Sequence, residues 1–168
     1  MISKKIILIG DFSTGKTSLI RRFVDNQFSD TYLSTIGVKI SRKTITLEDE
    51  TIQGLIWDIE GGTDKKPVNL TYVKGAHGCI IVADITRADT IGNLSSYIDI
   101  VQNIAPAAPF VLALNKADCF DITQREKILK ETMDRYKEIT ASIYLTSAKT
   151  GEGVEMMFKE IAQLMIKG

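Results

Sequence analysis

Gly10-Asp11-Phe12-Ser13-Thr14-Gly15-Lys16-Thr17 is a glycine-rich segment with the spacing G-x-x-x-x-G-K-T. It lies between an apolar run, Ile6-Ile7-Leu8-Ile9, and a segment with helical periodicity. Glycines let the backbone curl so that several N–H groups converge, and the start of a helix adds partial positive charge. The alternative, a simple turn before a helix, is a poor explanation, because these positions rarely match by chance between a strand and a helix. The sequence therefore predicts a phosphate-binding loop, called the P-loop below.

Two side chains of this loop carry the predicted chemistry. We expect Lys16 to reach the β- and γ-phosphates of a nucleoside triphosphate as a point charge. The Thr17 hydroxyl is expected to take one position around Mg²⁺, because that hard cation prefers oxygen ligands. The remaining predicted phosphate contacts are Gly10, Ser13, Thr14, Gly15 and Ser18.

Composition limits the class of protein. With 168 residues, of which 44% are hydrophobic and 25% charged, the chain is predicted to form one domain over residues 1–168. The formal net charge is zero, which argues against nucleic acid or an anionic membrane as partner. Cys79 and Cys119 have no metal-site spacing and are expected to be reduced thiols. Without a signal peptide, a membrane span or a C-terminal cysteine to prenylate, we expect a cytoplasmic, monomeric chain without a membrane anchor.

The first half of the chain alternates strands, a helix and polar loops. We expect a strand over about Lys5 to Gly10, a helix from Lys16 to about Asp25, and a mobile loop from Asn26 to Gly37. Glu48-Asp49-Glu50 separates two strand-like runs, which predicts an antiparallel hairpin. The strands of this hairpin are Val38 to Leu47 and Thr51 to Asp58. From Gly61 to Gly75 a second mobile region is expected, with Pro67 in the first turn if a helix forms there.

The second half has the pattern of parallel strands covered by helices. Cys79 to Ala83 and Phe110 to Leu114 are short unbroken apolar runs, typical of central parallel strands. A helix over about Ala88 to Ile104 is expected between them. Thr123-Gln124-Arg125-Glu126 has capping-box spacing, which predicts a helix to about Glu138. A strand over Ser142 to Thr146 and a final helix complete a doubly wound α/β fold. The core stripe of that helix is Val154, Met157, Phe158, Ile161, Ala162 and Met165.

Asn115-Lys116-Ala117-Asp118 stands at the end of the predicted strand Phe110 to Leu114. In a dry pocket a carboxylate can accept two hydrogen bonds, and the guanine edge offers adjacent N–H donors where adenine has an acceptor. We therefore expect Asp118 to select guanine. Alone, this four-residue pattern is also compatible with a surface loop after a strand. Following a P-loop in the same chain, it favours a guanine nucleotide.

Two further segments end predicted strands. Asp58-Ile59-Glu60-Gly61 offers a carboxylate that can hold Mg²⁺ through water and a glycine amide that can approach a γ-phosphate. A helix cap or a turn is the alternative for Asp58. Ser147-Ala148-Lys149 follows the last strand and could present a backbone N–H to the guanine carbonyl.

These motifs, together with Thr35 in the segment Ser34-Thr35-Ile36-Gly37, occur in an order that resembles a Ras-superfamily small GTPase. The resemblance covers the whole chain. Tyr72 to Gly78 and the pair Trp57-Asp58 are most similar to the Rab branch. The resemblance implies a six-stranded, mostly parallel sheet with one antiparallel strand and about five helices. It also implies a GTP/GDP switch that uses Mg²⁺, as in signalling and vesicle trafficking.

The resemblance assigns roles to single residues. It implies that Thr35 ligates Mg²⁺ when a γ-phosphate is present, beside Thr17 and Asp58, that Phe28 packs against the base, and that Lys116 braces the P-loop. Residues 26–37 and 61–75 would be the two switch regions, which effectors, exchange factors and activating proteins contact. The expected catalytic residues are Lys16, Thr35, Gly61 and Gly62.

Three departures from the family pattern bear on hydrolysis. The family usually has glutamine, which orients the attacking water, where this chain has Gly62. Phe12 and Ser13 replace small residues or glycine, which predicts an aromatic ring at the mouth of the γ-phosphate site. Ile59 and Glu60 replace the usual threonine and alanine.

Two functions fit these residues: a slow GTPase switch that depends on an activating protein, or a GTP-binding scaffold with little hydrolysis. A P-loop kinase or ATPase would leave Asp118 unexplained. His77 is the only histidine, and we expect it to be structural or solvated rather than a substitute base.

Overall fold

The computed structural model describes residues 1–31, 34–140 and 142–168. Within them one six-stranded sheet has the order β2-β3-β1-β4-β5-β6, with β2 antiparallel to β3 and the other neighbours parallel. This is the sheet that the sequence predicted. The strands are β1 Ile2–Gly10, β2 Val38–Thr46, β3 Thr51–Ile59, β4 Gly78–Asp84, β5 Phe110–Asn115 and β6 Ser142–Leu145.

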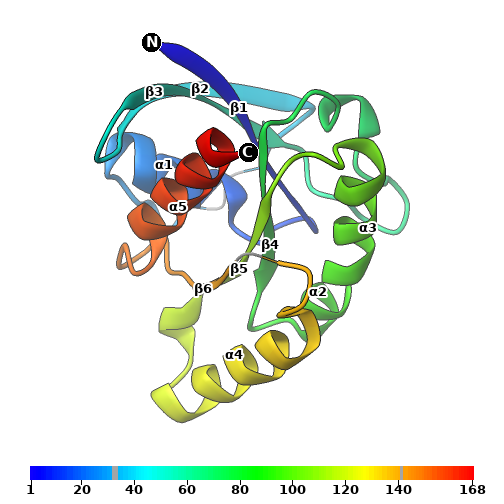
Figure 1. The fold of residues 1–168 in the computed structure, drawn as a ribbon. Coiled ribbons are helices and arrows are strands. Elements are labelled where there is room, and N and C mark those ends of the chain that lie inside the picture. The colour runs from blue at the N-terminus through cyan, green and yellow to red at the C-terminus, as the bar shows by residue number, and fades with distance from the viewer. Residues whose placement is uncertain (32–33, 141) are drawn as a thin grey trace.

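Helices cover both faces of the sheet. One face carries α1 and α5, and the opposite face carries α2, α3 and α4 (Figure 1). The helices are α1 Lys16–Asp25, α2 Ala88–Gly92, α3 Leu94–Ile104, α4 Ile122–Tyr136 and α5 Val154–Lys167, with 3₁₀ turns η1 Leu70–Tyr72 and η2 Ala117–Cys119. Among the described residues, each helix is too short or too polar to cross a membrane.

The unbroken apolar runs are explained by this two-sided cover. Successive side chains of a strand point to opposite faces, so Ile7 and Ile9 of β1 pack under α3 while Ile6 and Leu8 pack under α5. All four are fully buried. The predicted stripe of α5 is buried at every position, which confirms that it belongs to the core.

Several boundaries differ from those predicted. β1 begins at Ile2 rather than Lys5, because Ile2 pairs with Ile52 of β3. The helix predicted over Ala88 to Ile104 is divided at Gly92-Asn93, two residues of low helix propensity. α4 ends at Tyr136 instead of Glu138.

The capping box of α4 also begins two residues earlier than predicted, at Asp121 instead of Thr123. Asp121 accepts a hydrogen bond from the N–H of Gln124 at 2.9 Å, and the Gln124 side chain accepts one from the N–H of Asp121 at 3.3 Å. Thr123 therefore lies inside the first turn instead of capping it. Aspartate is at least as good an N-cap as threonine, and the pattern Asp-x-x-Gln competes directly with Thr-x-x-Glu.

The two loop regions have little regular structure. Described residues between Asn26 and Gly37 form neither helix nor strand, whereas Tyr32 and Leu33 of that predicted loop lie outside the described residues. Pro67 does not start a helix, because the short turn η1 begins at Leu70 and is capped by the Asn69 side chain. The carboxyl ends of the parallel strands meet at one edge of the sheet, where α/β folds bind ligands.

Candidate functional site

The P-loop joins the end of β1 to α1. Ser13 (φ 64°) and Gly15 (φ 98°) have left-handed backbone conformations, which curl the loop over the start of the helix. A Cβ at residue 15 would lie 2.3 Å from Asn115 Nδ2, so only glycine fits there. Within the described chain no side chain caps the start of α1. Its first N–H groups and positive end are therefore available to an anion.

Lys16 is held against the inside of this loop. Its side chain is 5% exposed, and Nζ donates to the Asp11 carbonyl at 2.9 Å. Burial lowers the pKa of Lys16 to about 8, although the carboxylates of Asp58 and Asp11 oppose the change. A bound phosphate would favour the charged ammonium form, so the site gains electrostatic stabilisation from a phosphate ligand.

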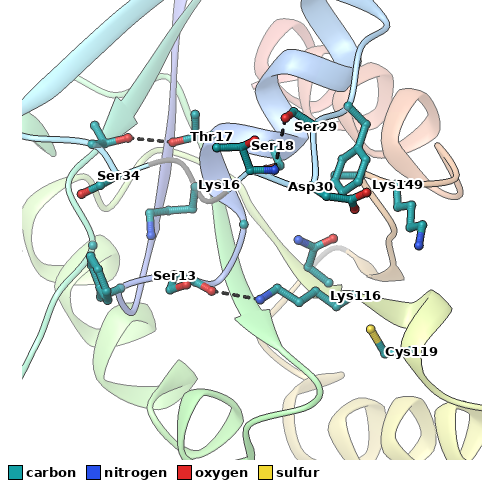
Figure 2. Close-up of a pocket in the computed structure, with 18 of the residues that line it drawn as sticks. Ser13, Lys16, Thr17, Ser18, Ser29, Asp30, Ser34, Lys116, Cys119 and Lys149 are labelled. Atoms are coloured by element: carbon teal, nitrogen blue, oxygen red, sulfur yellow. Dashed lines mark hydrogen bonds between the residues drawn. The ribbon is translucent and has the colours of Figure 1, made fainter.

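Three side chains with oxygen atoms, from separate segments, meet beside Lys16. Thr17 Oγ1 lies 2.7 Å from Thr35 Oγ1 (Figure 2). It also donates to Asp58 Oδ2 at 2.6 Å. Thr35 Oγ1 also reaches Asp58 Oδ2, at 3.2 Å.

The second carboxylate oxygen of Asp58 has no partner. Asp58 is 2% exposed, and its Oδ1 is buried without a hydrogen bond among the described residues. Burial raises the pKa of Asp58, an effect that hydrogen bonds from Thr17 and the charge of Lys16 oppose. A divalent cation that prefers oxygen would satisfy this oxygen and stabilise the charge, so the residues present fit Mg²⁺.

Gly61 and Gly62 continue β3 across the P-loop. The Gly62 N–H donates to the Gly10 carbonyl at 3.1 Å, and the Phe12 N–H donates to the Gly62 carbonyl at 2.9 Å. A Cβ at residue 61 would lie 2.5 Å from Phe12 Cα. The close approach of these two backbones therefore requires glycine at residue 61.

The space in which a side chain of residue 62 would begin is occupied by Tyr97 and Val68. A Cβ there would lie 2.5 Å from Tyr97 Oη and 3.2 Å from Val68 Cγ2. Phe12 does line the pocket mouth and is 40% exposed. The sequence nevertheless gave no sign that Tyr97, on α3, occupies the space beside Gly62.

At the other end of the pocket, Asp118 follows β5. Its Oδ1 accepts a hydrogen bond from Ser147 Oγ at 2.7 Å, and Ser147 Oγ in turn accepts one from the Thr150 N–H at 3.1 Å. The expectation of a dry carboxylate is wrong for this structure, because Asp118 is exposed. Ser147 orients the carboxylate, and a base that covered it would supply the desolvation.

The loop of residues 147–149 is fixed from α1. Arg22 Nε donates to the Ala148 carbonyl at 2.8 Å, and Arg22 Nη2 donates to the Lys149 carbonyl at 2.7 Å. These bonds join the helix that starts at the phosphate site to the segment predicted to face the base. This role of Arg22 could not be predicted from the sequence, because Arg22 is an arginine on a helix without any local motif.

Asn115 and Lys116 brace the P-loop from β5. Asn115 Nδ2 donates to the Thr14 carbonyl at 3.0 Å. Lys116 Nζ donates to the Ser13 carbonyl at 3.2 Å (Figure 2). Lys116 Nζ also pairs with Asp84 at 2.8 Å. The structure thus contains the contact between Lys116 and the P-loop that the resemblance implied.

These groups surround one pocket of about 340 Å³, large enough for a small organic ligand. Thirteen of the predicted site residues line it: Ser13, Gly15, Lys16, Thr17, Ser18, Phe28, Thr35, Gly61, Asn115, Lys116, Asp118, Ala148 and Lys149. The other predicted residues lie behind the wall: Gly10, Thr14, Asp58, Gly62 and Ser147. Lining residues that sequence reasoning did not assign are Ser29, Asp30, Thr31, Ser34, Ile59 and Cys119.

His77 lies outside this pocket lining. Its ring Nδ1 accepts a hydrogen bond from the backbone N–H of Lys5 at 2.8 Å, and the backbone N–H of His77 donates to the Lys5 carbonyl at 2.8 Å. These bonds support the expectation that His77 is structural.

A second network, also missed, supports the P-loop from α2 and α3. Asp11 accepts hydrogen bonds from Tyr97 Oη at 2.7 Å and from Asn93 Nδ2 at 2.8 Å. Arg87 Nη2 donates to the Phe12 carbonyl at 2.6 Å. Asp11 and Phe12 occupy variable positions of the P-loop pattern, so no motif could indicate these partners.

The fold, the phosphate loop and the oxygen cluster define a P-loop nucleotide-binding protein. The sequence model of the Ras family matches residues 5–167. The Ras-related protein Rab-1C of Dictyostelium discoideum is 36% identical over 162 residues, covering 94% of this chain and 78% of that protein. Rab-13 of Mesocricetus auratus is 34% identical over 161 residues (95% and 78%), and Rab-1 of Theileria annulata is 35% identical over 163 residues (96% and 73%).

The chain therefore belongs to the Ras superfamily of GTPases and, within it, to the Rab branch. It is a small GTPase, a switch that binds GTP and GDP with Mg²⁺ and hydrolyses GTP. Membership also implies regulatory and effector partners.

Proposed function

We propose that this chain is a slow GTPase switch whose hydrolysis depends on an activating protein. The observation that carries the proposal is the closed position of residue 62. Gly62 is buried beside Tyr97, and a Cβ there would lie 2.5 Å from the tyrosine oxygen. The position that usually orients the attacking water thus has no side chain and little room for one.

Phosphoryl transfer needs positioning and charge stabilisation more than covalent chemistry. Lys16 would bind the phosphate oxygens with its ammonium group, and Gly61 lines the same pocket. Thr17, Thr35 and Asp58 would hold Mg²⁺, which neutralises charge on the phosphates when bound. An arginine from a partner can add roughly 10³ to 10⁵ in rate, enough to offset the missing glutamine.

The proposal also assigns the base and partner contacts. Asp118, oriented by Ser147, would accept the two N–H groups of guanine, while Phe28, at the pocket wall, would pack on its face. Effectors, exchange factors and activating proteins would contact residues 26–37 and 61–75. Residues 32 and 33 of the first region lie outside the described part of the chain.

A GTP-binding scaffold with little hydrolysis is the second candidate. The same closed position at residue 62 favours it, since Gly62 has no side chain that could hold the attacking water. The two functions differ in one respect: the scaffold would keep GTP even with a partner that supplies an arginine.

Two measurements on the purified chain test the proposal. Mass analysis of the nucleotide released from fresh protein should find GDP or GTP, and adenine nucleotides there would contradict the assignment of Asp118. Single-turnover hydrolysis should be slow and dependent on Mg²⁺. A fast reaction that ignores removal of Mg²⁺ would contradict the assignment of Thr17, Thr35 and Asp58.

A further inference from the structure

Glu60 occupies a position between the two proposed switch regions. Its backbone N–H donates to the Gly37 carbonyl at 2.8 Å, and its side-chain Oε1 accepts from the Gly37 N–H at 2.9 Å. Both polar groups of Gly37 are thus bound by one residue. Gly37 has φ 70°, which makes it the turn from the first switch region into β2.

The same carboxylate reaches the second switch region. Glu60 Oε2 lies 2.8 Å from Lys66 Nζ. Lys66 closes a turn with Thr63, in which the Thr63 N–H donates to the Lys66 carbonyl at 2.9 Å and the Lys66 N–H donates to Thr63 Oγ1 at 3.0 Å. Glu60 therefore contacts residue 37 on one side and residue 66 on the other.

The residues that follow Glu60 are fixed as well. Gly62 is hydrogen-bonded to the P-loop on both sides of its backbone, at 3.1 Å to Gly10 and 2.9 Å to Phe12. Tyr97 covers it and holds Asp11 at 2.7 Å. Every bond in this set joins protein atoms only, so it does not need a phosphate or a cation in order to form.

We propose that Glu60 is a positioning residue that fastens the end of the first switch region to the start of the second in both nucleotide states. This inference rests on the proposed switch function and names a regulatory feature of the same site. Chains with alanine at this position cannot form the side-chain bond to residue 37, because the bond requires a side-chain oxygen as acceptor.

The fastening restricts Thr35 through chain length. A residue spans at most about 3.6 Å of extended chain, so Thr35 Cα can lie no more than roughly 7 Å from Gly37 Cα. With Gly37 fixed, Thr35 stays near Asp58, to which it is bonded at 3.2 Å. Loss of the γ-phosphate would then release the loop before Thr35 but leave Gly37, Glu60 and Gly62 in place.

Amide hydrogen exchange on the whole chain, loaded with Mg²⁺ and either GDP or a non-hydrolysable GTP analogue, tests this inference. In the parent, the amides of Gly37, Glu60 and Gly62 should exchange at rates within about twofold in the two states. Glu60→Ala should raise exchange at Gly37 about tenfold with GDP, as expected for loss of a hydrogen bond to a charged group. With the GTP analogue the rise should be smaller, because Thr35 would then also ligate Mg²⁺ and hold the segment before Gly37.

Two matched variants separate positioning from general destabilisation. Glu60→Gln keeps an oxygen that can accept from Gly37, so it should raise exchange less than Glu60→Ala. Lys66→Met removes only the ion pair with an exposed lysine and should leave Gly37 within about twofold of the parent. Strands β4 and β5 serve as an internal reference and should not change.

Two results would overturn the inference: unchanged exchange at Gly37 in Glu60→Ala, or a parent in which Gly37 exchanges more than tenfold faster with GDP. If Glu60→Ala fails to fold, the parent comparison and Glu60→Gln still decide. Failure of the switch function would look different, because the loop of residues 26–31 would then exchange equally with both nucleotides.

Discussion

The hydroxyl of Tyr97 lies directly against Gly62, at 2.5 Å from the point where a Cβ of residue 62 would stand. The same hydroxyl donates to Asp11 of the P-loop at 2.7 Å. One side chain of α3 thus supports the phosphate loop and excludes a side chain from the position that the family uses to orient water.

Placing a methyl group at residue 62 should be costly unless Tyr97 is shortened. Gly62→Ala is expected to destabilise the GDP-bound chain by about 1–3 kcal/mol, the usual cost of overpacking. In a Tyr97→Phe background the next atom of the ring, Cζ, lies at an ordinary 3.6 Å, so the cost should be smaller. Denaturant unfolding of the parent, both single variants and the double variant measures the coupling, and strict additivity would show that Tyr97 does not close the site.

Asp118→Asn should change the preferred base. An amide N–H would replace one carboxylate acceptor, which weakens GDP and GTP but suits the second carbonyl of xanthine. A competition titration with guanine and xanthine nucleotides measures both effects. Ser147→Ala is the matched control, and it should weaken guanine without improving xanthine, because it removes only the group that orients Asp118. Unchanged GDP affinity in Asp118→Asn would remove this residue from the base site.

Arg22→Met should speed release of nucleotide while leaving the P-loop intact. It removes the two bonds that hold the carbonyls of Ala148 and Lys149 but keeps an unbranched side chain on α1. Release of fluorescent GDP should accelerate about tenfold. Arg22→Met removes two hydrogen bonds from a charged group, and the stabilisation that each bond provides is reduced where solvent reaches it. Release at the parent's rate would show that Arg22 does not support the base segment.

Nucleotide binding should take up a proton above pH 8. The pKa of Lys16 is lowered to about 8 by burial in the free chain, whereas a phosphate favours the charged form, so binding raises this pKa. Affinity should therefore fall as the pH rises above 8. Calorimetry in two buffers of different ionisation heat measures the number of protons taken up on binding. The uptake by Lys16 should approach one proton at pH 9 and be near zero at pH 7. Lys16→Arg is the control, since arginine stays charged, and equal uptake by that variant would contradict the assignment.

Local patterns were sufficient to predict the sheet and most of the pocket wall. The P-loop spacing fixed one end of the site, and the run Phe110 to Leu114 placed Asn115 and Asp118 at the neighbouring strand end, since both follow from residue types over a few positions. What the sequence could not indicate are contacts between distant segments. Tyr97 against Gly62 and Arg22 against Ala148 depend on how helices pack, and neither residue has a local signature.

Competing local signals explain the smaller errors. Thr123 was the predicted cap of α4, whereas Asp121, two residues earlier, caps it in the structure. The predicted obstacle at the γ-phosphate side was Phe12, because an aromatic residue is visible in a motif. Phe12 does line the pocket mouth, and the packing of α3 adds Tyr97 beside Gly62, behind the pocket wall.

Single-turnover hydrolysis of GTP by the parent, Gly62→Gln, Tyr97→Phe and the double variant tests whether the closed position at residue 62 makes this switch slow. We predict a slow parent, little gain in either single variant, and a double variant faster by about 10- to 100-fold, the range expected when a reacting group becomes well positioned. Phe12→Gly alone should not restore the rate. A parent that hydrolyses GTP rapidly by itself, or a set of four rates without coupling, would show that another group, such as Thr63, already positions the water and would contradict this account.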